Sequence, residues 1–300
     1  MVSLRNILAL SLLTIATISN TVSAQSGMLY GVFRSDNGCI LMSLSPDTGD
    51  NTTIANVDIC DKATNGLFPS YSAYDATNNA LIIAIQSAPD VYSVDITTGK
   101  STSLVPLPTY NSSDFLLGLQ LIKNTIYVVT QYHVYSAPLS GASSLTDLKV
   151  PLSAPQYAQV ATVPTGGSGG AARLFIADEN SKAIYIVDLG APTAKVNSIS
   201  STIGGTILLQ YSTNVNQLVE LLSYQLYVTN PNTGKSTKLN SVPDGSGYPR
   251  VNGLSPDQSS IFIIDFDKMF TMSLKDGTVG PFFPFKGAPR VVGFPQWVAA

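Results

Sequence analysis

The chain has 300 residues, with 16 Lys and Arg against 19 Asp and Glu, so its formal net charge is −3 and its charged fraction is 12%. That fraction is well below the roughly 25% of average globular proteins, and Lys and Arg are not clustered, which excludes the electrostatic footprint of a nucleic-acid or anionic-lipid binder. With one His and two Cys, the sequence also excludes zinc and copper sites of the usual kind.

The first 24 residues have the pattern of a secretory signal peptide. Arg5 provides the positive start, residues 7–16 are apolar, and Val22, Ser23 and Ala24 resemble a cleavage site. The apolar run is shorter than the roughly 20 residues that span a bilayer, and the alternative interpretation is an uncleaved anchor. We therefore expect residues 25–300 to form one secreted, extracellular domain without membrane insertion.

The rest of the chain repeats one phrase six times: an alternating apolar strand, a turn that contains Gly, and a second strand rich in Ser and Thr. The copies begin 42 to 52 residues apart and contain strand signals only. Such a period predicts the blades of a β-propeller. The six phrases span residues 39–49, 91–99, 134–141, 184–190, 226–234 and 269–277.

Two more strands precede each phrase, which gives four antiparallel strands per blade. The strand next to the phrase is expected at 28–33, 81–85, 125–130, 173–178, 218–222 and 261–266. The leading strand is expected at 69–74, 116–121, 159–163, 206–211 and 250–254. Five continuous blades follow from this pattern, at about 67–107, 114–152, 157–201, 205–242 and 247–285.

The first blade lacks a leading strand, and the end of the chain contains the missing piece. Residues 288–295 (APRVVGFP) match residues 248–255 (YPRVNGLS), with Pro, Arg, Val and Gly in register. We therefore predict an all-β, six-bladed propeller closed by the C-terminal strand joining the N-terminal blade, which brings Trp297 close to Leu29. Closure of this kind leaves no long free sheet edge.

The Gly of each phrase is expected in a turn with positive φ, where a side chain with a Cβ is unfavourable. Replacing Gly99 or Gly234 with Val should therefore destabilise the protein.

Three covalent features are expected in an oxidising compartment. Cys39 and Cys60 flank one predicted strand pair and are expected to form a disulfide, the alternative being two small buried thiols. Asn51 and Asn111 each begin an Asn-x-Ser/Thr sequence in a polar, turn-like segment, so both are predicted glycosylation sites.

The sequence offers little for nucleophilic catalysis. A Ser-His-Asp triad could use only His133, which lies between two predicted strands and is expected to be a turn residue that faces water. No Gly-x-Ser-x-Gly elbow lies between a predicted strand and a helix. We therefore predict no catalytic residue.

Residues 251–265 (VNGLSPDQSSIFIID) resemble a segment of the gluconolactonase and senescence-marker family. The resemblance implies a six-bladed propeller with a divalent metal, such as Ca²⁺, in the central tunnel and Asn252 as one ligand. Val292 occupies the corresponding position of the closing strand and departs from that ligand pattern, so no bound cofactor is expected. Residues 173–188 are similar to YWTD and NHL repeats, and residues 226–230 to the YVTN repeat, each over one blade.

Three functions are compatible with this sequence. The first is a secreted propeller that binds an extracellular protein or glycan through its loops, without catalysis of its own. The alternative is a calcium-assisted lactonase or hydrolase of the gluconolactonase type. The third is a purely structural component of a matrix or coat.

Overall fold

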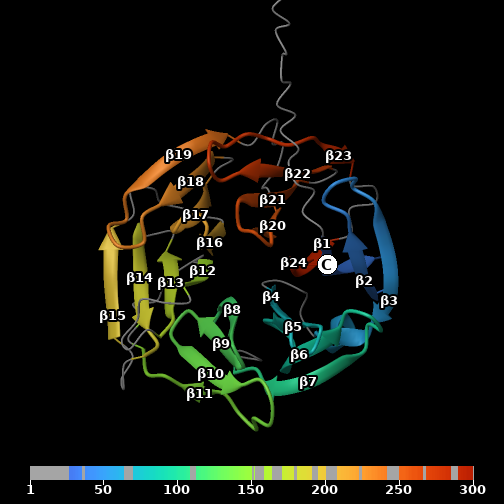
Figure 1. The fold of residues 1–300 in the computed structure, drawn as a ribbon. Helices are drawn as coiled ribbons and strands as arrows, with labels where there is room; N and C mark the ends of the chain where they lie inside the picture. The colour runs from blue at the N-terminus through green and yellow to red at the C-terminus, as the bar shows by residue number, and fades with distance from the viewer. Residues whose placement is uncertain are drawn as a thin grey trace, which may run out of the picture.

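The described residues of the computed structural model are 27–35, 38–63, 70–108, 113–150, 152, 159–163, 171–178, 181–190, 195–200, 208–222, 225–241, 250–265, 268–284 and 290–299. They form six four-stranded antiparallel sheets arranged around one axis (Figure 1). The predicted all-β, six-bladed propeller is thereby confirmed.

Five blades are continuous in sequence, and in each of them the first strand is innermost and the last is outermost (Figure 1). Blade 2 contains β4 (Ser70–Asp75), β5 (Ala80–Ile85), β6 (Asp90–Asp95) and β7 (Ser101–Pro106), and blade 3 contains β8 (Leu116–Ile122), β9 (Thr125–Thr130), β10 (Val134–Pro138) and β11 (Thr146–Asp147). Blade 4 contains β12 (Gln159–Val163), β13 (Arg173–Asp178), β14 (Ala183–Asp188) and β15 (Lys195–Ser200), and blade 5 contains β16 (Leu208–Ser212), β17 (Gln217–Leu222), β18 (Gln225–Thr229) and β19 (Ser236–Ser241). Blade 6 contains β20 (Arg250–Leu254), β21 (Ser260–Asp265), β22 (Lys268–Ser273) and β23 (Phe283–Pro284).

Blade 1 is built from both ends of the described chain. Its strands are β1 (Gly27–Ser35), β2 (Gly38–Leu44), β3 (Asn51–Val57) and β24 (Arg290–Ala299), and β24 is the innermost. Strand β24 pairs antiparallel with β1, with Leu29 opposite Trp297 and Phe33 opposite Val291. The C-terminal strand thus occupies the inner place that the sequence match predicts for it.

Apolar packing between neighbouring blades holds the ring together. Because successive side chains of a strand point to opposite faces, a sheet placed between two others is apolar on both faces. All six residues of β5 are buried, for example. The buried apolar side chains of the described residues form six clusters, and each cluster joins two adjacent blades. The cluster that joins blade 6 to blade 1 contains Leu29, Phe33, Phe262 and Met269, so packing continues across the closure.

The phrase glycines are needed for two reasons. The prediction holds for five of the six, with φ of 76° at Gly49, 70° at Gly99, 77° at Gly141, 70° at Gly234 and 73° at Gly277, but the sixth, Gly190, is not among the residues with positive φ. Four of the five also lie against the outer strand of the preceding blade. A Cβ at Gly234 would come within 2.1 Å of the Ser200 carbonyl oxygen, and one at Gly99 within 2.5 Å of the Ala55 Cβ. These glycines therefore fix the spacing between blades as well as the turn.

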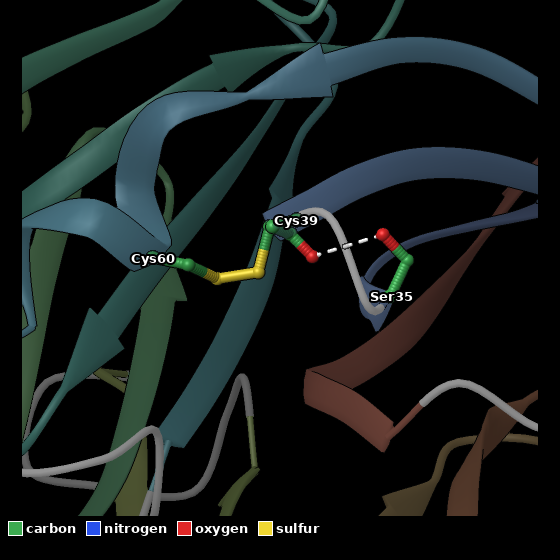
Figure 2. Close-up of a disulfide and its surroundings, with 4 residues drawn as sticks. Ser35, Cys39 and Cys60 are labelled. Atoms are coloured by element: carbon green, nitrogen blue, oxygen red, sulfur yellow. Dashed lines mark hydrogen bonds between the residues drawn. A yellow bond between two sulfur atoms is a disulfide. The ribbon is translucent and has the colours of Figure 1, made fainter.

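A disulfide joins Cys39 to Cys60, as the sequence predicts (Figure 2). Cys39 lies in β2, and Cys60 lies in a short 3-10 helix, η1 (Asp58–Lys62), which follows β3. The two Cα atoms are 5.8 Å apart, within the range that disulfides adopt. Beside the bond, the Ser35 hydroxyl donates a hydrogen bond of 3.2 Å to the Gly38 carbonyl. The crosslink ties the end of the outermost strand of blade 1 back to its neighbour.

None of the helices within the described residues is both long enough and apolar enough to cross a membrane.

Candidate functional site

The structure separates the residues that the sequence singles out. Asn252 lies in β20, at a register shift between Val251 and Gly253, and its side chain is outside the described residues. Asn51 begins the outer strand β3 with an exposed side chain, as a glycan acceptor requires, whereas Asn111 is outside the described residues. His133 immediately precedes β10, and its side chain is 42% exposed, as expected for a turn residue. The metal and glycosylation assignments stay predictions.

A cavity of about 300 Å³ lies on the propeller axis and is lined by the innermost strand of every blade. We call it the axial channel. Its described lining is mainly hydroxyl, amide and apolar groups; the polar side chains that line it are Tyr71, Ser72, Tyr74, Gln120, Thr162, Gln210, Tyr211 and Gln296. The inner strands have no further strand beside them, so their backbone N–H and C=O groups face this channel and need other partners.

Glutamine side chains provide some of these partners across blade boundaries. The Gln120 Nε2 of blade 3 donates to the Val160 carbonyl of blade 4 at 3.1 Å, and its Oε1 accepts from the Thr162 hydroxyl at 2.8 Å. The Gln296 Nε2 of β24 donates to the Ser72 carbonyl at 3.2 Å and lies 3.3 Å from the Ser72 hydroxyl. The second pair links the closing strand to blade 2.

The described channel lining is electrically neutral. It contains no Asp, Glu, His, Lys or Arg, and burial raises the pKa of Tyr71, which keeps that phenol protonated. Calcium sites in proteins are built largely from carboxylate oxygens, so these described residues do not fit a calcium ion. Within the described ranges, moreover, no three His, Cys, Asp or Glu side chains come together to hold a metal.

A second feature lies on the loops of blade 3. Phe115, just before β8, is 56% exposed, and Tyr132, in the turn between β9 and β10, is 48% exposed. The two loops touch, because the Gln131 N–H donates to the Phe115 carbonyl at 2.9 Å and the Tyr132 N–H donates to Asp114 Oδ1 at 3.2 Å. Phe115 and Tyr132 thus lie on two touching loops, and we call these two residues together with the adjacent His133 the aromatic face.

Gln86, from the turn between β5 and β6 of blade 2, fixes this surface from the other side. Its Nε2 donates to the Asp114 carbonyl at 3.0 Å, and its Oε1 accepts from the Leu116 N–H at 2.5 Å. One side chain therefore holds the backbone on both sides of Phe115. The loop is positioned by two blades before any partner arrives.

His133 belongs to a small charged cluster behind the aromatic face. Its Nδ1 lies 3.1 Å from Asp147 Oδ2, which also accepts from Lys149 Nζ at 2.8 Å. Burial alone would raise the pKa of Asp147, but the hydrogen bonds from Lys149 and the nearby positive charges outweigh it and hold that pKa below its usual value. The His133 ring centroid is 5.3 Å from that of Tyr135.

This cluster makes the stability of blade 3 dependent on pH. A carboxyl group whose pKa is lower in the folded than in the unfolded state stabilises the fold above the unfolded pKa, and the benefit is lost as the pH falls through the folded pKa. We expect Asp147→Asn to lower the melting temperature at neutral pH and to melt like the wild type at an acidic pH well below the folded pKa of Asp147. Thermal melting at both pH values measures this, with Asp47→Asn as an exposed-turn control. An equal deficit at both pH values would contradict it.

The aromatic face was not predicted from the sequence. Phe115 and Tyr132 are separated by two strands, β8 and β9, and Gln86 lies 30 residues before the Leu116 N–H that it binds. The sequence contained one weak signal. Large aromatic residues in two polar loops of the same blade are unusual, because exposed apolar groups on loops often mark an interaction site. Only the folded arrangement shows that these loops meet.

The sequence matches no protein-family model, and no curated protein matches it significantly. Its structure, in contrast, resembles solved structures at low sequence identity. A chain in the crystal structure of the nidogen/laminin complex gives a TM-score of 0.63 at 14% identity, over 89% of this chain and 96% of that one. The periplasmic gluconolactonase of Pseudomonas aeruginosa gives 0.53 at 15% identity, over 91% and 85% of the two chains. A putative 6-phosphogluconolactonase from Bacteroides fragilis gives 0.50 at 11% identity, over 93% and 99%.

At these identities the likeness shows the fold alone. It agrees with the resemblance of the sequence to gluconolactonase-type and YWTD propellers, and it places proteins of different roles on the same architecture.

Proposed function

We propose that this protein is a secreted propeller that binds a protein partner on the aromatic face, without catalysis of its own. The observation that carries the proposal is the exposure of Phe115 and Tyr132 on two touching loops whose backbone is already fixed by hydrogen bonds.

Exposed aromatic rings of this kind are characteristic of protein interfaces. Tyr, Trp and Phe are enriched there relative to the rest of a protein surface, and a few such residues provide most of the binding free energy. The loops are held in place by Gln86 and by the hydrogen bond from the Gln131 N–H to the Phe115 carbonyl. Binding of a partner would therefore cost little conformational entropy. Rigid aromatic groups on loops of a rigid scaffold therefore favour recognition of a partner.

The mixed charge behind the aromatic rings is also suited to a protein surface. Asp114 accepts from the Tyr132 N–H, and the ion pair of Asp147 with Lys149 lies on the same blade, so both signs of charge accompany the aromatic residues, as in the polar rim of a protein interface. One solved structure with this fold comes from a complex named after two proteins, nidogen and laminin, which supports a protein partner over a glycan.

Secretion is the second part of the proposal. The signal-like residues 1–24, the disulfide between Cys39 and Cys60, and the exposed sequon at Asn51 support it together. Disulfides persist in oxidising compartments and are rare in the cytosol. Mass spectrometry of protein from the culture medium of its natural source tests this, because we expect a mature chain that begins at Gln25 and bears a glycan on Asn51.

The binding proposal is tested with a double variant, Phe115→Ala with Tyr132→Ala. Wild-type and variant proteins are used to capture partners from the extracellular fluid of the natural source, and the captured protein is then purified and titrated against each. We expect the double variant to bind at least about thirtyfold more weakly, since hot-spot truncations cost about 2 kcal/mol or more.

The matched control is Phe282→Ala in blade 6. Phe282 is 46% exposed, so the variant removes an aromatic side chain of similar exposure from a different blade of the propeller. It should bind the partner as the wild type does. Equal weakening by the control, or unchanged binding by the double variant, refutes the proposal. A glycan that binds at Phe115 and Tyr132 in a glycan array would assign the surface to a different class of partner.

A calcium-assisted lactonase is the alternative, and the place of Asn252 in an inner strand beside the channel favours it. The gluconolactonase-type neighbours share its fold. Elemental analysis and melting curves with calcium and with a chelator decide this point. A bound divalent ion, a chelator-dependent melting temperature and lactone hydrolysis would together replace the binding proposal.

A further inference from the structure

We propose that a cavity between blades 2 and 3 binds a small organic amine, with the ammonium group beside the Asp75 carboxylate and the apolar stem against aliphatic side chains. We call this cavity the interblade cleft. It lies at the end of the propeller that carries the phrase turns, whereas the turn that holds Tyr132 lies at the opposite end. The cleft and the aromatic face are therefore separate sites.

The boundary between blades 2 and 3 is more open than the others at which a phrase glycine shows the spacing. An added Cβ would lie only 2.1 to 2.7 Å from the outer strand of the preceding blade at Gly234, Gly99, Gly49 and Gly277. At Gly141, in the corresponding turn of blade 3, no atom lies within 4 Å. Its neighbours Leu139 and Ser140 instead line a cavity of about 280 Å³, whose opposite wall includes Thr102 and Leu104 of β7.

The described lining of the cleft contains one charged side chain, that of Asp75, and no Lys, Arg or His. Asp75 is opposite Ala80 in the sheet, and Ile82 and Ser93 form the next opposed pair on the same face, toward blade 3. Asp75 is only 3% exposed. Because water screens a buried charge less than an exposed one, this carboxylate favours a cationic ligand over a neutral or anionic one.

Asp75 is oriented by its own turn. Its Oδ1 accepts from the Thr77 N–H at 3.0 Å and the Asn78 N–H at 3.3 Å, and its Oδ2 accepts from Asn78 Nδ2 at 2.6 Å. Since a carboxylate oxygen has two lone pairs, Oδ2 can accept one more hydrogen bond. The carboxylate is thus in place before a ligand binds, which lowers the entropic cost of binding.

Hydroxyl groups provide further acceptors for an ammonium group. Ser93 and Thr102 are opposed residues of β6 and β7, and Ser140 lies across the cleft in blade 3. None of these three hydroxyls makes a hydrogen bond to another residue that the structure describes. An ammonium group has three N–H donors and no acceptor, so one carboxylate oxygen together with hydroxyl oxygens satisfies it.

Aliphatic side chains form the rest of the wall and distinguish an amine from a metal ion. Ile82, Leu104 and Leu139 line the cleft and also belong to the apolar cluster that joins blades 2 and 3. Leu104 and Leu139 are only partly buried in that cluster, so they keep apolar surface for a ligand. The stem of an organic amine covers this surface, whereas a metal ion would not, and one carboxylate is too few for calcium. The volume suits a small molecule.

Ligand-observed NMR titration tests the proposal at neutral pH with three probes of similar size: 3-methylbutylamine, 3-methylbutanol and 3-methylbutanoate. The first is a cation, the second is neutral and the third is an anion. We expect the amine to bind with one-to-one stoichiometry, and the alcohol and the carboxylate to bind at least about tenfold more weakly. Nα-acetyl-lysine methylamide presents the same group as a protein side chain. If it binds about tenfold more tightly than the free amine, the ammonium group comes from a lysine of a partner.

Asp75→Asn removes the charge and keeps an oxygen for the turn, so we expect it to weaken the amine by about tenfold or more and to leave the alcohol unchanged. The matched control is Asp95→Asn. Asp95 Oδ1 accepts from the Thr97 and Thr98 N–H groups in a similar turn of the same blade, but Asp95 does not line the cleft. This control should bind the amine as the wild type does.

If Asp75→Asn melts much below the wild type, Thr102→Tyr replaces it, because a ring at this exposed position fills the cleft. Its control is Ser103→Tyr, on the other face of β7. The proposal is overturned if no amine binds at about 50 mM, if the alcohol binds as tightly as the amine, or if a control weakens binding as much as its partner variant. Since Phe115→Ala with Tyr132→Ala leaves the cleft intact, this result is independent of the partner-binding test.

Discussion

Deletion of residues 290–300 is expected to abolish the cooperative fold. Strand β24 is the inner strand of blade 1, and it also contacts β4 of blade 2 and β20 of blade 6. Without it, β1 loses its inner hydrogen-bonding partner, and the fully buried side chains of Leu29 and Phe33 lose cover on that side. An unpaired central edge of this kind promotes aggregation. Size-exclusion chromatography and near-ultraviolet circular dichroism measure the outcome, and we expect a loss of monomer and of fixed tertiary structure.

The control is deletion of Ala300 alone, which lies beyond β24 and should change nothing. A synthetic peptide of residues 286–300, added in trans to the truncated protein, should restore part of the near-ultraviolet signal, while a scrambled peptide should not. A truncated protein that stays monomeric and melts within a few degrees of the wild type would show that β24 does not close the ring.

Gly234→Val is expected to give the largest loss of stability of any single substitution that we consider. A side chain with a Cβ at positive φ costs about 1–2 kcal/mol, and overpacking adds about 1–3 kcal/mol. Both apply at Gly234, where φ is 70° and the new Cβ would lie 2.1 Å from the Ser200 carbonyl oxygen of blade 4. We therefore expect a loss of about 4 kcal/mol, or a fall of roughly 8–16 °C in melting temperature.

Gly141→Val separates the two contributions. Gly141 has a similar φ, 77°, but no atom lies within 4 Å of the position of an added Cβ. It should therefore lose only the conformational part, about 1–2 kcal/mol. Chemical denaturation of both variants measures the difference. Equal losses would mean that the close approach between blades 4 and 5 has no energetic consequence.

The fold could be predicted because each blade is a local pattern. Alternating apolar residues, a Gly turn and a second polar strand all lie within about 40 residues, and the period of the pattern gives the blade number. Closure was predictable for the same reason, since residues 288–295 repeat the inner-strand pattern of residues 248–255. The second role of the phrase glycines was not, because Gly234 and Ser200 meet only when two blades pack.

The backbone conformation of some turns also could not be predicted from the residue type that occupies them. Lys123 has φ of 55° in the tight turn after the inner strand of blade 3, where Asn79 and Asn216 have the same conformation in blades 2 and 5. Asn tolerates the left-handed region well, but Lys shows no such preference. The repeated fold imposes this conformation on whichever residue occupies the position.

The candidate sites could not be predicted because their parts come from different blades. The aromatic face needs Gln86 of blade 2 beside Phe115 and Tyr132 of blade 3. The axial channel needs one strand from each of six blades. In a propeller, residues that are neighbours at the axis or on a rim lie about 40 residues apart in sequence, so spacing gives no signal of their proximity. The residue that a sequence resemblance did suggest, Asn252, has its side chain outside the described residues.

The aromatic face and the axial channel both depend on a closed propeller, because closure sets the width of the channel and the rigidity of the loops. The most direct test introduces Met28→Cys and Val298→Cys, which replace directly opposed residues of β1 and β24. Opposed residues of antiparallel strands have Cα atoms about 4.5–5.5 Å apart, within disulfide range. We predict that peptide mapping of the oxidised monomer by mass spectrometry finds residues 28 and 298 joined beside the native Cys39–Cys60 bond. Two thiols that both stay reactive toward maleimide in the folded monomer would contradict closure.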